Sequence, residues 1–296
     1  MTILVTGGTG QLARLLGQAG LGQACGADVR VVGRPDFDFD RPDTLEAALA
    51  DRPSLVVNAA AWTAVDAAEA EPDAAQRANQ VGPATLAALC ADRAIPLIHI
   101  STDYVFDGNK GSPYTETDST SPTGIYGQTK LEGEQAVLAA CLRATVLRTS
   151  WVYSAVGKNF VRTMLSSAQN TSMLRVVADQ RGNPTSAHDL ATAILAIADR
   201  LRDGWSPAYA GVFHMTGQGD TTWHGLAEAL FHDAARHGRP APTVIPITTA
   251  EWPTPARRPP DSRLDCAKLE RVFGLRLPPW QASLRSVVDI LVGPST

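Results

Sequence analysis

Tyr126-Gly127-Gln128-Thr129-Lys130 is the stretch of this 296-residue chain around which the rest can be interpreted. Two residues four positions apart on a helix lie one turn apart on the same face, so the ammonium of Lys130 would stand beside the phenol of Tyr126. A free phenol has a pKa of about 10, and a nearby positive charge lowers that pKa. The pattern predicts a general acid poised near the working pH. Ordinary surface helices share this spacing, so its meaning depends on the surrounding chain.

A glycine turn near residue 1 predicts a nucleotide-binding fold. The β-branched run from Thr2 to Thr6 is typical of a strand, and Gly7-Gly8-Thr9-Gly10-Gln11-Leu12-Ala13 then leads into a helical pattern. Strand, glycine turn and helix form the entry to a dinucleotide-binding unit. We expect Gly7 to make the turn, Gly10 to let the backbone approach a pyrophosphate, and Ala13 to let helix and strand pack closely. The helix N-terminus would then face the phosphates.

The end of the second expected strand, Val29 to Val32, bears on the choice of cofactor. In such folds an acidic residue at this place binds the ribose 2′-hydroxyl of NAD, whereas an arginine accommodates the 2′-phosphate of NADP. Gly33-Arg34 follows the strand, and Asp36, Asp38 and Asp40 come next. Arg34 favours NADPH and the aspartates keep NADH open, although each of these charges also suits a plain polar loop.

Strands and helices alternate through residue 150. Further strands are expected at 55–57, 97–100 and 144–147, and small or polar residues follow each of them. The alternation predicts an α/β fold with a Rossmann-type doubly wound parallel sheet. Such sheets bind ligands at the carboxyl ends of their strands. His99 lies inside an apolar run and is expected to be a packed core residue.

The composition changes after residue 155, where prolines and arginines concentrate and strands become fewer. We expect residues 1–155 to form the dinucleotide-binding domain. Residues 156–296 would form mainly a smaller C-terminal substrate-binding α/β subdomain, with the chain crossing between the two.

Three segments of the chain carry further expectations. Asp66, Glu69 and Glu71 should begin a solvated region. Pro72 to Ala91 should form a helix with a kink or break at Gly82-Pro83, and Asn79 should either bond to a neighbouring loop or lie on the surface. The proline-rich run from Pro253 to Pro260 should be extended; Arg257 and Arg258 on it either bind phosphates or belong to a solvated linker.

Charge and composition exclude several classes of protein. The net charge of -4 provides no basic surface for nucleic acid or for a membrane. No apolar run approaches the roughly 20 residues that span a bilayer, and no signal peptide is expected. The spacing of His224, His232 and His237 does not suit a zinc site on a helix. Four widely spaced cysteines, Cys25, Cys90, Cys141 and Cys266, are expected to be reduced and buried in a cytoplasmic protein.

The chain resembles the extended short-chain dehydrogenase/reductase family over nearly its whole length. The resemblance rests on six segments, namely Gly7 to Ala13, Asn58-Ala59-Ala60-Ala61-Trp62-Thr63, Ser101-Thr102-Asp103-Tyr104-Val105-Phe106, Tyr126 to Lys130, Arg148-Thr149-Ser150-Trp151-Val152-Tyr153 and Thr254-Pro255-Ala256-Arg257-Arg258-Pro259. The third, fifth and sixth are the most specific. A narrower resemblance is to the members that complete dTDP-L-rhamnose synthesis. It implies NAD(P)H-dependent reduction of the C4 ketone of the dTDP-sugar dTDP-4-dehydro-L-rhamnose.

The resemblance implies a role for each matching residue. Tyr126 would protonate the C4 carbonyl oxygen while a nicotinamide delivers hydride, Lys130 would hold the nicotinamide ribose and tune Tyr126, and Thr102 would hydrogen-bond the same carbonyl. The other implied contacts are Gly10, Gln11 and Leu12 at the pyrophosphate, Asp38 and Phe39 at the adenine, Ala61, Trp62 and Thr63 along the cofactor, Asp103 beside Thr102, Trp151 on the sugar ring, and Arg257 and Arg258 at the diphosphate.

The chain departs from its apparent relatives at two places. Some of them bind Mg²⁺ at a dimer contact through glutamates, where this chain has Arg14-Leu15 and Ala187-His188; a hard cation takes oxygen ligands, so no metal is expected there, and a homodimer stays open. Related dehydratases carry a glutamate after the threonine-aspartate pair, where this chain has Tyr104. Two other functions stay open: a cofactor-binding regulatory subunit, and an epimerase or another sugar-nucleotide reductase on the same scaffold.

Overall fold

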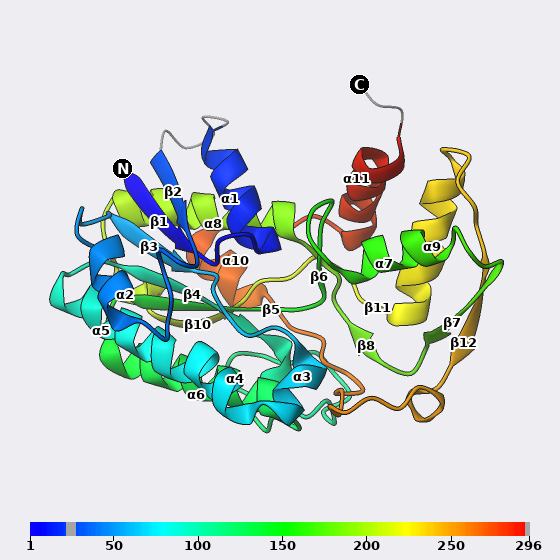
Figure 1. The fold of residues 1–296 in the computed structure, drawn as a ribbon, viewed down its shortest axis with the longest axis horizontal. Helices are drawn as coiled ribbons and strands as arrows, with labels where there is room; N and C mark the ends of the chain where they lie inside the picture. The colour runs from blue at the N-terminus through cyan, green and yellow to red at the C-terminus, as the bar shows by residue number, and fades with distance from the viewer. Residues whose placement is uncertain (22–27, 294–296) are drawn as a thin grey trace.

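A parallel sheet of six strands forms the centre of the larger lobe in the computed structural model, which describes residues 1–21 and 28–293 (Figure 1). The strand order is β10-β5-β4-β3-β1-β2, and every neighbouring pair is parallel. The strands are β1 (Thr2–Thr6), β2 (Asp28–Val32), β3 (Leu55–Asn58), β4 (Leu97–Thr102), β5 (Ala144–Thr149) and β10 (Gly211–His214). The predicted doubly wound Rossmann-type sheet is confirmed.

Helices cover both faces of this sheet, as Figure 1 shows. One face carries α1 (Gln11–Leu21), α8 (Ala187–Arg202) and α10 (Ala267–Phe273), and the other carries α2 (Pro42–Ala48), α5 (Gly82–Asp92) and α6 (Ile125–Ala140). Successive strand residues point to opposite faces, so Ile3 and Val5 join the first core and Leu4 joins the second. His99 is fully buried, as predicted.

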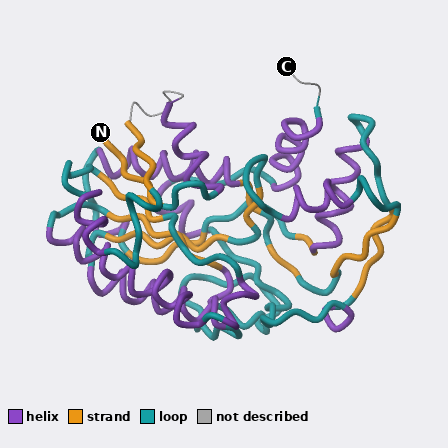
Figure 2. The backbone as a smooth tube through the Cα atoms, in the orientation of Figure 1, coloured by secondary structure: helices purple, strands orange, loops and turns teal. Residues whose placement is uncertain are grey.

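A smaller lobe holds three two-stranded pairings and three helices. The pairings join β7 (Met173–Val177) to β12 (Thr243–Ile247), β8 (Arg181–Gly182) to β11 (Thr221–Thr222), and β6 (Val152–Tyr153) to β9 (Thr185–Ser186). The helices are α7 (Phe160–Ser167), α9 (Trp223–Ala235) and α11 (Trp280–Val292), which share a core around Leu230 and Leu284. Figure 2 shows these short strands and helices gathered at the end of the molecule away from the N-terminus.

The chain returns from the smaller lobe to the large sheet. Helix α8 packs along α1, and strand β10 adds the edge strand beside β5. Helix α10 then contacts β10. Three elements that follow residue 156 therefore complete the sheet and one of its covering layers.

The region between β3 and β4 differs from the sequence expectation. The expected long helix is divided into α4 (Pro72–Gln76), a π-helical turn (Arg77–Val81) and α5, so the irregularity precedes Gly82-Pro83. A short helix, α3 (Val65–Ala70), comes before it. Glu69 accepts a hydrogen bond from the backbone N–H of Ile125 at 2.8 Å and so stabilises the first turn of α6. The predicted solvated region is therefore partly engaged in tertiary contacts.

Three cysteines in the described part of the chain are free thiols: Cys90 and Cys141 are buried, and Cys266 is half-buried. Cys25 lies outside the described residues. None of the helices that the structure describes is long and apolar enough to cross a membrane.

Candidate active site

A cavity of ≈ 980 Å³ lies along the carboxyl ends of β1, β3, β4 and β5 and extends to the smaller lobe. Fifteen of the seventeen residues expected at the site line it, namely Gly7, Gly10, Gln11, Leu12, Arg34, Asp38, Phe39, Ala61, Trp62, Thr63, Thr102, Asp103, Tyr126, Lys130 and Trp151.

The two exceptions are Arg257 and Arg258 of the proline-rich segment, which lie elsewhere. The sequence motifs therefore converge on one site, except for that segment.

The glycine turn forms one end of the cavity. Gly7 has a φ of 107°, a backbone conformation that residues with a Cβ rarely adopt. The turn leads directly into α1, whose first residues Gln11, Leu12 and Ala13 line the cavity. The free N–H groups of a helix N-terminus attract anions, so this end suits a pyrophosphate.

Charged side chains at the end of β2 are paired with one another. Arg34 contacts Asp38 at 3.0 Å and Asp40 at 3.2 Å, and its side chain is 69% exposed. Phe39 lies next to these residues on the cavity wall. An arginine and an aspartate thus both stand where an adenosine ribose is bound in such folds, and neither cofactor is excluded by charge.

The loop after β3 is held by Asn79 from the π-helical turn. Its side-chain oxygen accepts from the N–H of Trp62 at 2.8 Å, and its amide donates to the Trp62 carbonyl at 3.2 Å and to the Thr129 hydroxyl at 3.1 Å. Asn79 is fully buried, so of its two expected positions the contact with a loop is the correct one. It ties the cofactor side of the cavity to the helix that carries Tyr126.

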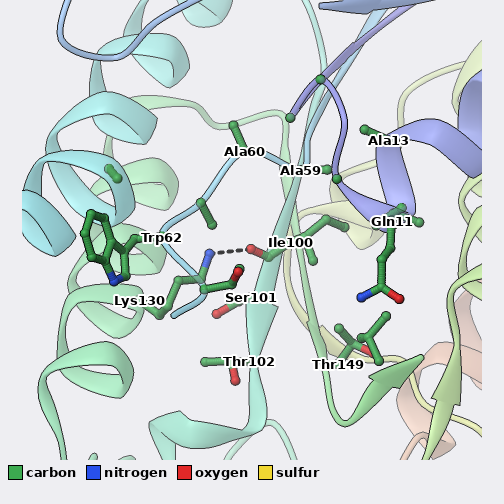
Figure 3. Close-up of a pocket in the computed structure, with 18 of the residues that line it drawn as sticks. Gln11, Ala13, Ala59, Ala60, Trp62, Ile100, Ser101, Thr102, Lys130 and Thr149 are labelled. Atoms are coloured by element: carbon green, nitrogen blue, oxygen red, sulfur yellow. Dashed lines mark hydrogen bonds between the residues drawn. The ribbon is translucent and has the colours of Figure 1, made fainter. Parts of the chain in front are cut away.

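Thr102, Tyr126 and Lys130 come together where β4 ends and α6 begins. The Lys130 ammonium donates to the carbonyl of Ile100 at 2.6 Å, as the dashed line in Figure 3 marks. Thr102 lies farther along the same strand, as Figure 3 shows; its hydroxyl donates to Oδ1 of Asp103 at 3.1 Å and interacts with the Tyr126 phenol. The ring of Tyr104 meets the ring of Tyr126 edge-on, with 5.7 Å between centroids. A proton donor, a cation and a hydroxyl thus share one wall of the cavity.

Burial shifts the pKa values of these groups. It raises the pKa of Tyr126 to about 12, and the hydrogen bond with Thr102 opposes that shift. It lowers the pKa of Lys130 to about 8, against the effect of the Glu134 carboxylate. Burial likewise raises the pKa of Asp103 to about 7. The shift of Tyr126 is opposite to the sequence expectation because desolvation of the phenolate outweighs the other effects. The Tyr126 phenol therefore stays protonated at neutral pH and can still act as a proton donor.

A buried ion pair stands behind Lys130. Arg148 of β5 contacts the Glu134 carboxylate through two nitrogens, with Nη2 to Oε2 at 2.7 Å, and Ser101 donates to the same carboxylate. Both charged side chains are at most 5% exposed. Loss of one partner would leave an unpaired buried charge, which is strongly destabilising.

Arg258 is engaged in a structural contact. Its Nη2 lies 2.8 Å from Oδ2 of Asp66 in α3, and its Nη1 donates to the Ala256 carbonyl at 2.7 Å. Arg257 is exposed. The proline-rich segment thus fastens the smaller lobe to α3, and its arginines do not line the cavity.

Several cavity residues were not singled out from the sequence. Thr149, Lys158, Phe160 and Trp223 all line the cavity. The Thr149 hydroxyl is buried and, among the described residues, has no hydrogen-bond partner. A buried polar atom of this kind calls for a partner, which a bound cofactor would supply. Thr149 belongs to the segment Arg148 to Tyr153, which already resembled the family, so the sequence could have indicated it. Trp223 and Lys158 belong to no motif that the sequence offered.

The two positions discussed above for Mg²⁺, at Arg14-Leu15 and Ala187-His188, carry no carboxylate side chain. Arg14 lies in α1 and His188 in the first turn of α8. Within residues 1–21 and 28–293, no group of three or more His, Cys, Asp or Glu side chains could hold a metal ion.

A doubly wound parallel sheet with a glycine turn, and a Tyr-x-x-x-Lys pair facing the same cavity, define an extended short-chain dehydrogenase/reductase. Residues 1–292 match the family model described as "RmlD substrate binding domain". The chain belongs to the dTDP-4-dehydrorhamnose reductase family.

Individual relatives agree over nearly the whole chain. A dTDP-4-dehydrorhamnose reductase of Sinorhizobium fredii is 45% identical, over 99% of this chain and 98% of that protein. The crystal structure of a dTDP-4-dehydrorhamnose reductase from Clostridium acetobutylicum has a TM-score of 0.90 at 37% identity and covers 98% of this chain and 99% of the other. A Bacillus anthracis reductase of that name, solved in complex with NADP, has a TM-score of 0.87 at 30% identity, covering 97% and 98%.

Proposed function

We propose that this protein reduces the C4 ketone of dTDP-4-dehydro-L-rhamnose to dTDP-L-rhamnose with NADPH. The observation that carries the proposal is the convergence of Thr102, Tyr126 and Lys130 on a cavity that begins at the glycine turn. Family membership supports the substrate, and the relative solved with NADP supports the cofactor.

The residues present fit a nicotinamide dinucleotide. The glycine turn and the start of α1 suit its pyrophosphate, the exposed Arg34 suits a 2′-phosphate, and the unpartnered Thr149 hydroxyl offers a polar contact deeper in the cavity. Asp38 keeps NADH open as a weaker alternative. The cofactor residues that we propose are Gly7, Gly10, Gln11, Leu12, Arg34, Asp38, Phe39, Ala61, Trp62, Thr63, Tyr126 and Lys130.

The bound cofactor supplies the hydride that C4 receives. Tyr126 donates its proton to the C4 oxygen as negative charge develops there, and Thr102 donates a hydrogen bond to the same oxygen. Lys130 is fixed by the Ile100 carbonyl and places a positive charge beside the phenol as it loses its proton. Asp103 and Trp151 bind the sugar. Since Arg257 and Arg258 lie off the cavity wall, we propose no contact between them and the diphosphate.

In this proposal the two lobes have different roles. The large sheet binds the cofactor, and the smaller lobe supplies the wall that faces the sugar nucleotide. The free thiols of Cys90, Cys141 and Cys266 suit a reducing compartment, so we place the protein in the cytoplasm.

The test is to supply dTDP-4-dehydro-L-rhamnose with NADPH or NADH and follow oxidation of the nicotinamide. We expect Tyr126→Phe to lose at least about a hundredfold in kcat, because general acid catalysis contributes on that order, while NADPH binding measured by fluorescence is retained. Near-normal turnover in this variant would reject the role of Tyr126. If the parent protein oxidised neither cofactor, the reductase assignment itself would fail and a regulatory role would replace it.

A further inference from the structure

A loop of the smaller lobe lies against the glycine turn of the larger lobe. The loop comprises residues 154–159, between β6 and α7. The Ser154 hydroxyl donates to the side-chain oxygen of Gln11 at 2.7 Å, and the Asn159 amide donates to the same oxygen at 2.9 Å. A Cβ at Gly157 would lie 2.9 Å from the Gln11 side chain, so the backbone of the loop approaches Gln11 closely. Gln11 thus joins the start of α1 to this loop.

Asn159 fixes the loop relative to α7 as well. Its side-chain oxygen accepts from the backbone N–H of Arg162 at 3.2 Å and so caps the first turn of that helix. Its amide, besides bonding to Gln11, donates to the Ser154 carbonyl at 2.9 Å. These contacts hold both ends of the loop, and the backbone of Lys158 between them therefore has a defined position.

The orientation of the Gln11 amide leaves its N–H groups available to a ligand. Both contacts from the loop go to the side-chain oxygen. Within the part of the chain that the structure describes, no residue forms a hydrogen bond with the side-chain nitrogen. Gln11 lines the cavity, and Figure 3 shows its side chain extending into that space. It can therefore donate to an anion held at the start of α1.

Lys158 adds a positive charge to the cavity wall. Among the described residues, the cations that line the cavity are Arg34, Lys130 and Lys158. Arg34 is paired with aspartates, and Lys130 is buried and bonded to the Ile100 carbonyl. Lys158 is exposed and has no hydrogen bond or ion pair with any residue of the described ranges. Its ammonium is therefore free to bind an anionic ligand in the cavity.

We propose that the loop 154–159 completes the pyrophosphate site of the cofactor, with Lys158 binding the pyrophosphate from the smaller lobe and Gln11 positioning the loop. The inference rests on the cofactor of the proposed function. Gly157 precedes Lys158 and approaches Gln11, which begins α1, and the N-terminus of that helix suits a pyrophosphate. This adjacency favours the cofactor over the diphosphate of the sugar nucleotide. A lysine ammonium binds such a group as a point charge. Both lobes would then hold the cofactor.

The test compares equilibrium binding of NADPH, followed by its fluorescence, to Lys158→Gln, Lys158→Arg and Arg239→Gln. Arg239→Gln is the matched control, because Arg239 is also exposed, carries the same charge and does not line the cavity. We expect Lys158→Gln to weaken NADPH binding about tenfold, in line with the loss of one hydrogen bond to a charged group. Lys158→Arg retains the charge and should recover most of the affinity, and Arg239→Gln should bind as the parent protein does.

The salt dependence separates an electrostatic contact from a purely structural role. The difference in NADPH affinity between the parent protein and Lys158→Gln should shrink as NaCl is raised, because salt screens exposed charges. Equal affinities at low salt would overturn the proposal, and so would a difference that did not change with salt.

Binding of dTDP, measured by calorimetry, distinguishes the two diphosphates. Lys158→Gln should bind dTDP as tightly as the parent protein does. A loss confined to dTDP would assign Lys158 to the sugar nucleotide and overturn its assignment to the cofactor. Since all these measurements are of binding, a parent protein that bound NADPH but did not reduce the ketone would contradict the proposed function alone, and the NADPH comparison would still decide the role of Lys158.

Discussion

Lys130 is a cation enclosed by protein, and its charge has to survive burial. The side chain is 2% exposed, and its nitrogen is held by the Ile100 carbonyl while Glu134 lies one turn farther along α6. Burial favours the neutral amine, whereas the carboxylate favours the ammonium. The balance leaves the pKa of Lys130 at about 8.

We expect kcat/KM for the sugar to fall as the pH rises through about 8, because the charge on Lys130 is lost there. Tyr126, with a pKa raised to about 12, stays protonated through this range and cannot account for the fall. The measurement is the pH profile of the parent protein and of Lys130→Arg, in which the charge persists to higher pH. A fall at the same pH in both proteins would refute the assignment.

The ionisation of Asp103 should add a second inflection to the same pH profile, at a lower pH than that of Lys130. Burial raises the pKa of Asp103 to about 7. In the pH profile of kcat/KM for Asp103→Asn, the inflection near pH 7 should therefore disappear while the inflection near pH 8 remains. The folded protein holds this proton to a higher pH than the unfolded chain does, so ionised Asp103 destabilises the fold as the pH rises from about 4 to 7.

At the scale of elements, the π-helical turn supplies a residue that sequence alone could not place. An asparagine in a helical run has low helix propensity, but its choice of partner depends on Trp62 and Thr129, which are 17 and 50 residues away. The alternating strands and helices, by contrast, follow from local patterns, and their order along the chain was predictable. Glu69 at the start of α6 was missed for the same reason as the asparagine, since its partner is 56 residues away.

We expect Asn79→Ala to raise KM for NADPH and to lower the free energy of unfolding by about 1–3 kcal/mol, the cost of leaving buried polar groups unpaired. The loop that contains Trp62 would lose its anchor, and that loop lines the cofactor side of the cavity. Gln76→Ala is the control, because Gln76 is exposed and bonds only to Gln80 among the described residues. Equal effects in both variants would show that the loop does not depend on Asn79.

At the scale of the whole molecule, contacts between distant parts of the chain decide what the motifs can do. Arg258 meets Asp66 across 192 residues, and Trp151 stacks on Trp223 from a distant part of the chain. Sequence motifs predicted the residues of the proposed catalytic wall and of the glycine turn, because each motif is a short local pattern at the end of a strand or the start of a helix. They left Arg258 open between a phosphate contact and a solvated linker, because its carboxylate partner, Asp66, is distant in the sequence.

We expect Asp66→Ala and Arg258→Ala to weaken the fold to a similar extent, with a coupling on the order of 1 kcal/mol in a double-mutant cycle of urea unfolding. Because Arg258 lowers the pKa of Asp66, this coupling is fully present above the usual aspartate pKa and is lost as the pH falls through the lowered pKa of the folded protein. Substrate affinity should change alike in the two single variants. If only Arg258→Ala lost affinity for the substrate, that result would indicate that Arg258 contacts the diphosphate.

The edge strand β10 has a consequence for how the protein is made. Its residues, Gly211–His214, leave the ribosome long after β5, against which they pair, and after α8, which covers one face of the sheet. A nascent chain that has emerged only to residue 155 would expose the apolar side of β1 and β5 to water. Cofactor binding should therefore be acquired late in translation, once most of the sugar-facing lobe has also been synthesised.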